Sequence, residues 1–296
     1  MINALTVDFE DWYHGLTSTS AMPERWPDFE RRLEGASTWL LDALDRRGTR
    51  ATFFIIGVVA RQYPDLVRRI AESGHEIGLH SDMHRLVRSM DRAAFRDDLA
   101  RNIESVRSAA GRDPSCYRAP AFSISARTPW FWEELAAAGI GADSSVFPIR
   151  TPLYGLPGAP RRPFRVATSA GTVLETPITT VRLLGRNLPF SGGFYFRALP
   201  YSLVRRLARS ENANGRAVCF YFHPWEFDPA HPRPDFITRR ERISHYTGLT
   251  AARAKFERLL DDFAMAPLGE IEVGVVPTLE PSRFIGEATA TSVPVA

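Results

Sequence analysis

The chain has 296 residues, of which 44% are hydrophobic and 24% charged, a composition that is typical of a globular protein and excludes a disordered one. Its formal net charge is only +3, and many arginines stand near acids in the sequence. We therefore expect no nucleic-acid-binding surface. No apolar run approaches the ~18 residues that span a membrane, and the N-terminus MINALTVDFEDWYH lacks a secretory signal, so we expect a cytoplasmic protein.

Short apolar segments alternate with amphipathic ones along most of the chain. The apolar segments predict strands at residues 4–9, 51–57, 75–80, 115–118, 140–144 and 217–223. The amphipathic segments predict helices at residues 37–47, 58–74, 91–110, 128–138, 199–209 and 250–263. This alternation indicates parallel βαβ units. So many units without a GxGxxG turn favour an α/β barrel over a dinucleotide-binding sheet.

Two stretches depart from this alternation. Residues 149–197 are rich in Pro, Gly, Arg and aromatic residues, and we expect long loops on the barrel rim there. Residues 279–296 are small and polar, which predicts a flexible tail. No domain boundary is visible before it, so residues 1–278 are expected to form a single domain. Cys116 and Cys219 lie far apart in apolar segments, as expected of buried free thiols.

Polar residues follow several of the predicted strands, at the end where α/β barrels hold their reacting groups. They are Asp8, Glu10 and Asp11 after the first strand, His80 and His84 after the third, Arg118, Asp143 and His223.

Two histidines with a nearby carboxylate form a usual ligand set for a catalytic divalent metal. The i, i+4 spacing of His80 and His84 would bring both imidazoles to one side of a turn, which the Ser81 hydroxyl could hold. Surface histidines can also cluster by coincidence, and acids often end strands simply because they face solvent. A lone His223 on an apolar strand would ordinarily be a core residue, but Pro224 and Trp225 end that strand and place His223 at the rim.

The segments DFED, GHEIGLHSDMH, YRAPAF, GADSSVFP and FYFHPWEF resemble, in order and spacing, the five motifs of NodB-type polysaccharide deacetylases, carbohydrate esterase family 4. The resemblance covers residues 3–228. NLPFSGGFYFR and the extension from about residue 229 are similar to the subgroup found with bacterial exopolysaccharide gene clusters. The resemblance implies a distorted (β/α) barrel that removes acetyl groups from N-acetylhexosamine units, with an N-acetylated oligo- or polysaccharide as partner.

The resemblance also implies a role for each strand-end residue. Asp8 matches the catalytic base, and Arg118 matches the arginine that orients it. His223 matches the general acid, and Asp143 matches the acid that orients this histidine. His80 and His84 match the metal ligands.

The first motif departs from the family's commonest form, in which two aspartates are adjacent. Either Glu10 or Asp11 would therefore be the third ligand of a divalent metal, with Zn²⁺ preferred and Co²⁺ or Ni²⁺ as alternatives. Phe122, Trp225, Tyr195 and Phe194 are candidates either for stacking on sugar rings or for packing.

Two rival functions remain at this point. One is a metal-independent cyclic amidase like the allantoinase branch of the same fold, and the other is a non-catalytic carbohydrate-binding or assembly protein. Without a signal peptide the sugar would be met inside the cell. A lipid-linked precursor at the inner membrane face would bring peripheral membrane contact.

Overall fold

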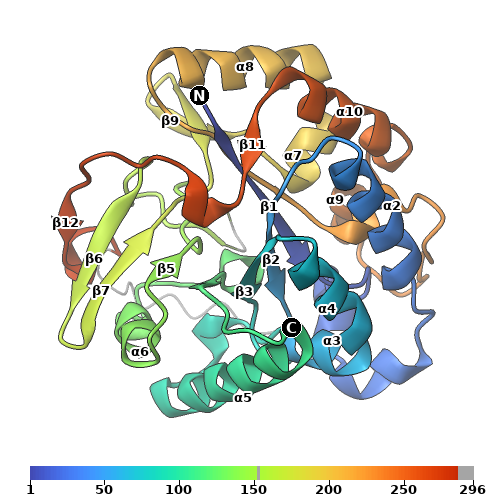
Figure 1. Cartoon of the computed structure of the whole chain (residues 1–296), viewed down its shortest axis with the longest axis horizontal. Helices are drawn as coiled ribbons and strands as arrows, with labels where there is room; N and C mark the ends of the chain where they lie inside the picture. The colour runs from blue at the N-terminus through green and yellow to red at the C-terminus, as the bar shows by residue number, and fades with distance from the viewer. Residues whose placement is uncertain (152–153, 286–296) are drawn as a thin grey trace.

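The computed structural model describes residues 1–151 and 154–285 (Figure 1). Its main sheet follows the order β10-β1-β2-β3-β4-β5-β7-β6-β12, with β11 (Met265–Ala266) also paired to β1. The first six strands of this order run parallel, as the βαβ pattern predicts. They are β10 (Cys219–Phe222), β1 (Asn3–Phe9), β2 (Thr52–Ile55), β3 (Glu76–Leu79), β4 (Cys116–Tyr117) and β5 (Ala142–Asp143).

The strand β1 is central to the fold because all seven of its residues are buried. Its register aligns Val7 with Phe222 of β10 and Phe9 with Ile55 of β2. The carboxyl ends of the parallel strands consequently meet at one rim, where the candidate polar residues follow them.

Helices cover the outside of the curved sheet (Figure 1). They are α2 (Leu33–Asp45), α3 (Gly57–Gln62), α4 (Pro64–Glu72), α5 (Arg92–Ala110), α6 (Phe131–Ala137), α8 (Tyr201–Ala213), α9 (Arg239–Tyr246) and α10 (Leu249–Asp262), with the short α1 (Thr17–Ser20) and α7 (Gly193–Ala198). The predicted helix at 58–74 is two helices, because Tyr63 precedes Pro64 and leaves the helical region at φ −132° and ψ 53°.

The prediction of rim loops at 149–197 is wrong for much of that stretch. It contains an antiparallel hairpin of β6 (Phe164–Thr168) and β7 (Gly171–Glu175), and a second hairpin of β8 (Thr180–Leu183) and β9 (Arg186–Pro189). The first hairpin joins the main sheet because β7 pairs with β5. The Pro- and Gly-rich composition of the stretch hid the β-branched residues that build these short strands.

The barrel is distorted rather than closed. The sheet path ends at β10 on one side and at β12 (Thr278–Leu279) on the other. Beside β10, a single parallel bridge joins Gly192 to Tyr221. A side chain at residue 192 would collide with the Tyr221 carbonyl oxygen, 2.1 Å from an added Cβ, so only glycine permits this approach. The predicted distorted (β/α) barrel is confirmed.

The predicted tail begins later than residue 279. Leu279 pairs with Val166 of β6, and Phe284 is buried against Trp132 and Phe164. The aromatic side chain of Phe284 therefore fixes a segment that composition alone made look mobile. Residues 286–296 lie outside the described part of the chain.

Both cysteines are free and buried, as expected. Within residues 1–151 and 154–285, no helix has the length and apolar character needed to cross a bilayer.

The packing of β3 yields a stability prediction. A Cβ on Gly78 would lie 2.7 Å from Cδ1 of Phe54 and 2.8 Å from Sγ of Cys116, both buried. We expect Gly78→Ala to lower the free energy of unfolding by about 1–3 kcal/mol, measured by urea denaturation. Gly35→Ala is the control, because its Cβ meets no atom within 4 Å and should stabilise α2 by at most about 1 kcal/mol. Equal stability of the Gly78→Ala and wild-type proteins would contradict this packing.

Candidate active site

Three side chains at the rim could hold a metal ion together. Glu10 follows β1, whereas His80 and His84 lie in the loop after β3. Each offers one ligand atom, these atoms lie within 4.8 Å of one another, and all three residues are buried. The i, i+4 histidines and one acid of the first motif thus meet in space.

The loop that carries the two histidines is a tight turn and not a helix. Ser81 and His84 adopt left-handed backbone conformations, with φ of 66° and 50°. The Ser81 hydroxyl accepts a hydrogen bond from the Arg85 amide at 2.9 Å, so its predicted turn-holding role is confirmed. Helix α5 supports the loop, since Asn102 Oδ1 accepts from the His80 amide at 3.0 Å and Asp98 Oδ2 from the Asp82 amide at 3.1 Å.

The hydrogen bonds of His80 leave one of its nitrogens free for a metal, whereas both nitrogens of His84 contact protein side chains. His80 Nδ1 lies 2.7 Å from the Arg118 carbonyl oxygen, which can only accept, so Nδ1 carries the proton and Nε2 keeps its lone pair. His84 Nδ1 lies 3.0 Å from Ser20 Oγ, and its Nε2 lies 2.9 Å from Glu10 Oε2.

The ionisation of this cluster also suits a cation. Burial lowers the pKa of His80 to about 4, so its imidazole is neutral near pH 7. Burial alone would raise the pKa of Glu10. The nearby histidines, first His84 and then His223 and His80, have the larger combined effect and hold this pKa below its usual range. Two imidazoles and one carboxylate form a donor set that fits a divalent metal.

Asp11 lies outside this cluster although it adjoins Glu10 in the sequence. Its Oδ2 accepts hydrogen bonds from the Arg32 and Leu33 amides at 2.9 and 3.1 Å, at the start of α2. Its Oδ1 accepts from the Trp12 amide at 2.8 Å. Burial raises the pKa of Asp11 to about 6, and these three amides oppose the rise. Of the two alternatives for the third ligand, the geometry favours Glu10 and gives Asp11 a structural role.

Asp8 is paired with a buried arginine. Arg118 Nη1 donates to Asp8 Oδ1 at 2.7 Å and to Thr6 Oγ1 at 2.8 Å. Its Nε and Nη2 donate to the carbonyl and hydroxyl oxygens of Ser144, at 3.1 and 2.9 Å. Four such bonds fix the guanidinium and therefore the direction of the Asp8 carboxylate.

His223 faces this carboxylate from the end of β10. Its Nε2 lies 3.7 Å from Asp8 Oδ2 and 3.8 Å from Glu10 Oε1. Its Nδ1 lies 3.4 Å from Glu226 Oε2, and Glu226 Oε1 accepts from Arg197 Nε at 2.6 Å. Burial lowers the pKa of His223, but the contact with Glu226 and the charges of Glu10 and Asp8 outweigh it and raise the pKa to about 9.

The acid beside His223 is therefore Glu226, in the place expected for Asp143. Asp143 instead accepts hydrogen bonds from Ser145 Oγ at 2.6 Å and Trp132 Nε1 at 3.1 Å. It is buried with Glu175, and burial raises the pKa of both carboxyls. Among the described residues, the carboxylates within 4.0 Å of His223 are those of Asp8, Glu10 and Glu226.

A sequence signal for Glu226 was present in HPWEF. Glutamate three residues after a helix-starting residue commonly turns back to its amide, and Glu226 Oε2 indeed accepts from the His223 amide at 3.1 Å. For Arg197 there was no comparable signal, because nothing in GGFYFR distinguishes a buried arginine from an exposed one.

The four aromatic candidates for sugar stacking lie in different environments, and Phe194 on α7 is partly buried. Trp225 is 4% exposed, stacks on His223 and His245, and donates its indole N–H to Glu10 Oε1 at 3.1 Å. Its ring is thus occupied by protein and positions Glu10 instead. Phe122 is buried, in edge-to-face contact with Phe147 and Tyr221. Tyr195 on α7 is only partly buried, so its side chain has a surface that a ligand could reach.

Two family models match consecutive parts of the chain. Residues 28–141 match the polysaccharide deacetylase family, and residues 144–272 match a domain of unknown function, DUF3473.

Curated relatives match over shorter segments. A peptidoglycan-N-acetylglucosamine deacetylase of Bacillus cereus is 33% identical over 81 residues, 27% of this chain and 30% of that protein. A chitooligosaccharide deacetylase of Bradyrhizobium sp. is 33% identical over 82 residues, 27% of this chain and 37% of that protein. A peptidoglycan-N-acetylmuramic acid deacetylase of Bacillus subtilis is 27% identical over 120 residues, 40% of this chain and 44% of that protein. The chain thus spans less than half the length of these relatives.

Solved structures resemble the whole fold. A protein of Mycobacterium smegmatis assigned to the polysaccharide deacetylases has a TM-score of 0.58 at 22% identity, covering 99% of this chain and 94% of that chain. Puue allantoinase has a TM-score of 0.56 at 15% identity, covering 89% and 85%. At these identities the likeness establishes the fold alone.

The separation of Glu10 from Asp11 yields a prediction about metal binding. Glu10→Gln should weaken the affinity for Zn²⁺, because it removes the anionic ligand. The loss should exceed the roughly 10–100-fold that is typical when a residue hydrogen-bonded to a metal ligand is replaced. The measurement is competition with a chromophoric chelator.

Asp11→Asn is the matched variant. It should keep metal affinity near that of the wild type. It should also cost about 1–3 kcal/mol of stability, because the asparagine NH₂ group that replaces one carboxylate oxygen cannot accept hydrogen bonds from the backbone N–H groups that Asp11 now binds. The reverse pattern, with metal affinity lost only in Asp11→Asn, would reassign the third ligand.

Proposed function

Since the chain carries a polysaccharide deacetylase domain of the NodB type, carbohydrate esterase family 4, we propose that it hydrolyses N-acetyl groups of hexosamine units in a bacterial polysaccharide in a metal-dependent reaction. The observation that carries this proposal is the convergence of Glu10, His80 and His84 beside the Asp8–Arg118 pair, facing His223. A carboxylate base, a metal site and an imidazole acid together form a set of groups that can hydrolyse an amide.

Glu10, His80 and His84 would hold the metal, with Zn²⁺ preferred for this N/O donor set and Co²⁺ or Ni²⁺ as alternatives. When bound, such an ion supplies Lewis acidity, which lowers the pKa of water from about 15.7 toward about 7 and stabilises negative charge on the substrate oxygen.

Asp8 is placed to act as the base. Arg118 holds Oδ1, which leaves Oδ2 on the side of His223 to take a proton from the attacking water. The hydroxyl oxygen then forms a bond to the acetyl carbonyl carbon. Arg118, which has no acceptor atom and is fully engaged, only orients this carboxylate.

His223 is placed to act as the acid. The C–N bond cannot break to release an amide anion, so the nitrogen must receive a proton as it leaves. With its pKa raised to about 9, chiefly by Glu226 against the effect of burial, His223 is protonated near pH 7 and can donate from Nε2. The products are acetate and a free amine, and Glu226 with Arg197 keeps the imidazole oriented.

The substrate is proposed to be an exopolysaccharide or its lipid-linked precursor. The named relatives are deacetylases of peptidoglycan and chitooligosaccharide, which supports an N-acetylated glycan. The exopolysaccharide choice rests on the motifs NLPFSGGFYFR and HPRPDFITRRERISHYTGL, which lie in the part matched by DUF3473. A cytoplasmic site at the inner membrane face follows if the glycan is met before export.

The test is acetate release from an N-acetylated chitooligosaccharide, with and without a chelator. We expect activity that the chelator abolishes and Zn²⁺ restores. Chelator-resistant hydrolysis of a cyclic amide would favour the allantoinase-like alternative, and metal-loaded protein without hydrolysis of any glycan would favour a carbohydrate-binding role.

Removal of the proposed acid should separate catalysis from metal binding. His223→Ala should lower kcat by about 10²–10⁴-fold, because the leaving nitrogen loses its proton donor. The metal content, measured by atomic emission, should stay at the wild-type value, since His223 is outside the ligand cluster. Loss of metal in parallel with activity would contradict the assignment.

Removal of the orienting acid should have a distinct signature. Glu226→Gln should lower kcat about tenfold or more with little change in KM, since the imidazolium loses its main stabilising partner. Because Glu226 raises the pKa of His223, the alkaline limb of the kcat profile should move to lower pH in this variant. Glu104→Gln, an exposed glutamate on α5, is the control, and an identical profile in both variants would exclude the role.

A further inference from the structure

The β8–β9 hairpin ends in an exposed apolar tip. Leu183, Leu184 and Leu188 are 57%, 95% and 40% exposed. The register pairs Leu183 with Arg186 and Val181 with Leu188, so Leu183 and Leu188 lie on the same face of the ribbon. Large apolar side chains therefore gather on one small, projecting element that belongs to a separate two-stranded sheet.

The turn residue Leu184 is unfavourable in two respects. Its φ is 48° and that of Gly185 is 77°, a pair of positive values for which Asn-Gly or Asp-Gly is the preferred sequence. This backbone region is unfavourable for leucine, and the side chain of Leu184 is almost fully exposed to water. Because contacts inside the protein do not offset either cost, the residue points to an apolar environment outside the protein.

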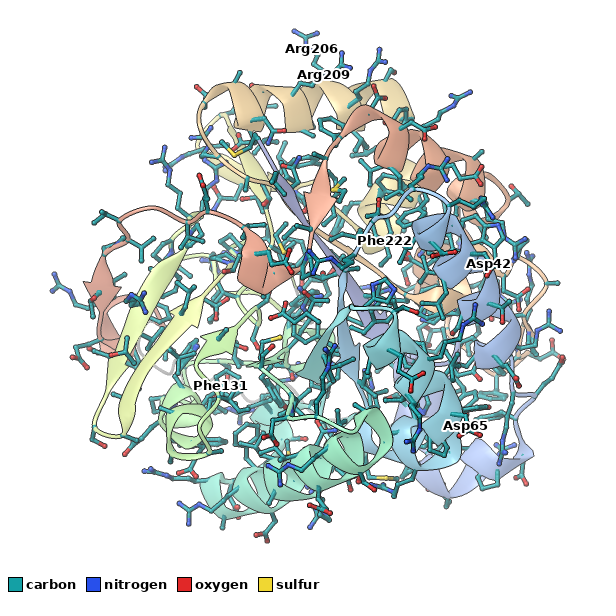
Figure 2. The ribbon with its side chains drawn as sticks, in the orientation of Figure 1. Asp42, Asp65, Phe131, Arg206, Arg209 and Phe222 are labelled. Atoms are coloured by element: carbon teal, nitrogen blue, oxygen red, sulfur yellow. The ribbon has the colours of Figure 1, made fainter. Side chains whose placement is uncertain are left out.

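The surroundings of the tip carry positive charge. Residues 176–210 contain six arginines and no Asp or Glu, although Arg197 is buried on Glu226 and Arg205 and Arg209 pair with Asp262. Arg182 and Arg186 are exposed at the tip itself. Figure 2 shows Arg206 and Arg209 projecting outward from α8.

Arg161 joins the base of the hairpin to α8. Its Nε donates to Thr180 Oγ1 at 3.1 Å, and its Nη2 lies 3.7 Å from Glu211 Oε1. Burial lowers the pKa of Arg161, and the positive charges of Arg216, Arg182 and Arg162 lower it further. The carboxylate of Glu211 acts in the opposite direction. Arg161 thus links the hairpin to the end of α8.

We propose that the hairpin, residues 180–189, docks on an anionic lipid bilayer. Leu183 and Leu184 enter the boundary between headgroups and acyl chains, and Arg182 and Arg186 bind the lipid phosphates. A second copy of the chain is the weaker occupant, because a two-fold contact through this tip would oppose the same arginines to one another. The proposal rests on the hairpin and the arginines around it and does not depend on the deacetylase activity.

The test is co-sedimentation of the full chain with phosphatidylcholine vesicles that contain or lack phosphatidylglycerol. We expect binding only to the vesicles with phosphatidylglycerol, and weaker binding as salt is raised. Leu184→Asn should lower the partition coefficient roughly tenfold, because it removes an inserted side chain while it suits the turn and preserves the fold. Arg182→Gln with Arg186→Gln should lower it by a similar factor or more.

Two controls alter equally exposed residues elsewhere. Val275→Asn removes an exposed apolar side chain outside the hairpin, and Arg68→Gln removes an exposed charge on α4. Both should bind vesicles as the wild type does. The proposal is overturned if the wild type binds neither vesicle, or if Leu184→Asn binds as tightly as the wild type. If the wild type binds no vesicles, and light scattering gives Leu184→Asn a different molar mass from the wild type, the occupant is a second copy of the chain.

Discussion

The buried guanidinium of Arg118 is the constraint on which the site depends. Its side chain fixes Asp8 and Thr6 of β1 and Ser144 after β5, and its carbonyl oxygen fixes the tautomer of His80. One residue directly after β4 therefore positions Asp8, the proposed base, and His80, a proposed metal ligand, and ties together the ends of β1, β3 and β5. Removing one partner from a buried, fully bonded ion pair typically costs about 3–5 kcal/mol, because the other charge is left without compensation.

The parts of this arrangement that strand geometry determines were predictable from the sequence. A strand has a two-residue repeat, so Thr6, Asp8 and Glu10 point to one side, and the first two do contact Arg118. The same repeat favours Glu10 over Asp11 as the third ligand. The repeat does not decide between them, because it ends with the strand at Phe9 and the chain turns there.

The roles of Asp143 and Glu226 depend on packing that motif spacing does not encode. Both acids are buried near strand ends. Asp143 turns toward Trp132 and Ser145, whereas Glu226 turns back on the amide and ring of His223. Likewise, the β6–β7 and β8–β9 hairpins were hidden by a Pro- and Gly-rich composition, although alternating strand and helix patterns gave the barrel correctly.

The C-terminal part of the chain supports the candidate site through a connected set of hydrogen bonds and a ring contact. Arg197 Nη1 and Nη2 donate to the carbonyls of His245 and Ser244 in the last turn of α9, at 2.9 and 2.8 Å, while its Nε holds Glu226. The His245 ring stacks on Trp225, whose indole N–H holds Glu10. Helix α9 thus supports both Glu226, beside the proposed acid His223, and Glu10, a proposed metal ligand. The guanidinium of Arg197 reaches these carbonyls and the carboxylate with three separate nitrogens, whereas a lysine carries all its donors on one, so a lysine at 197 would leave part of this network unbonded.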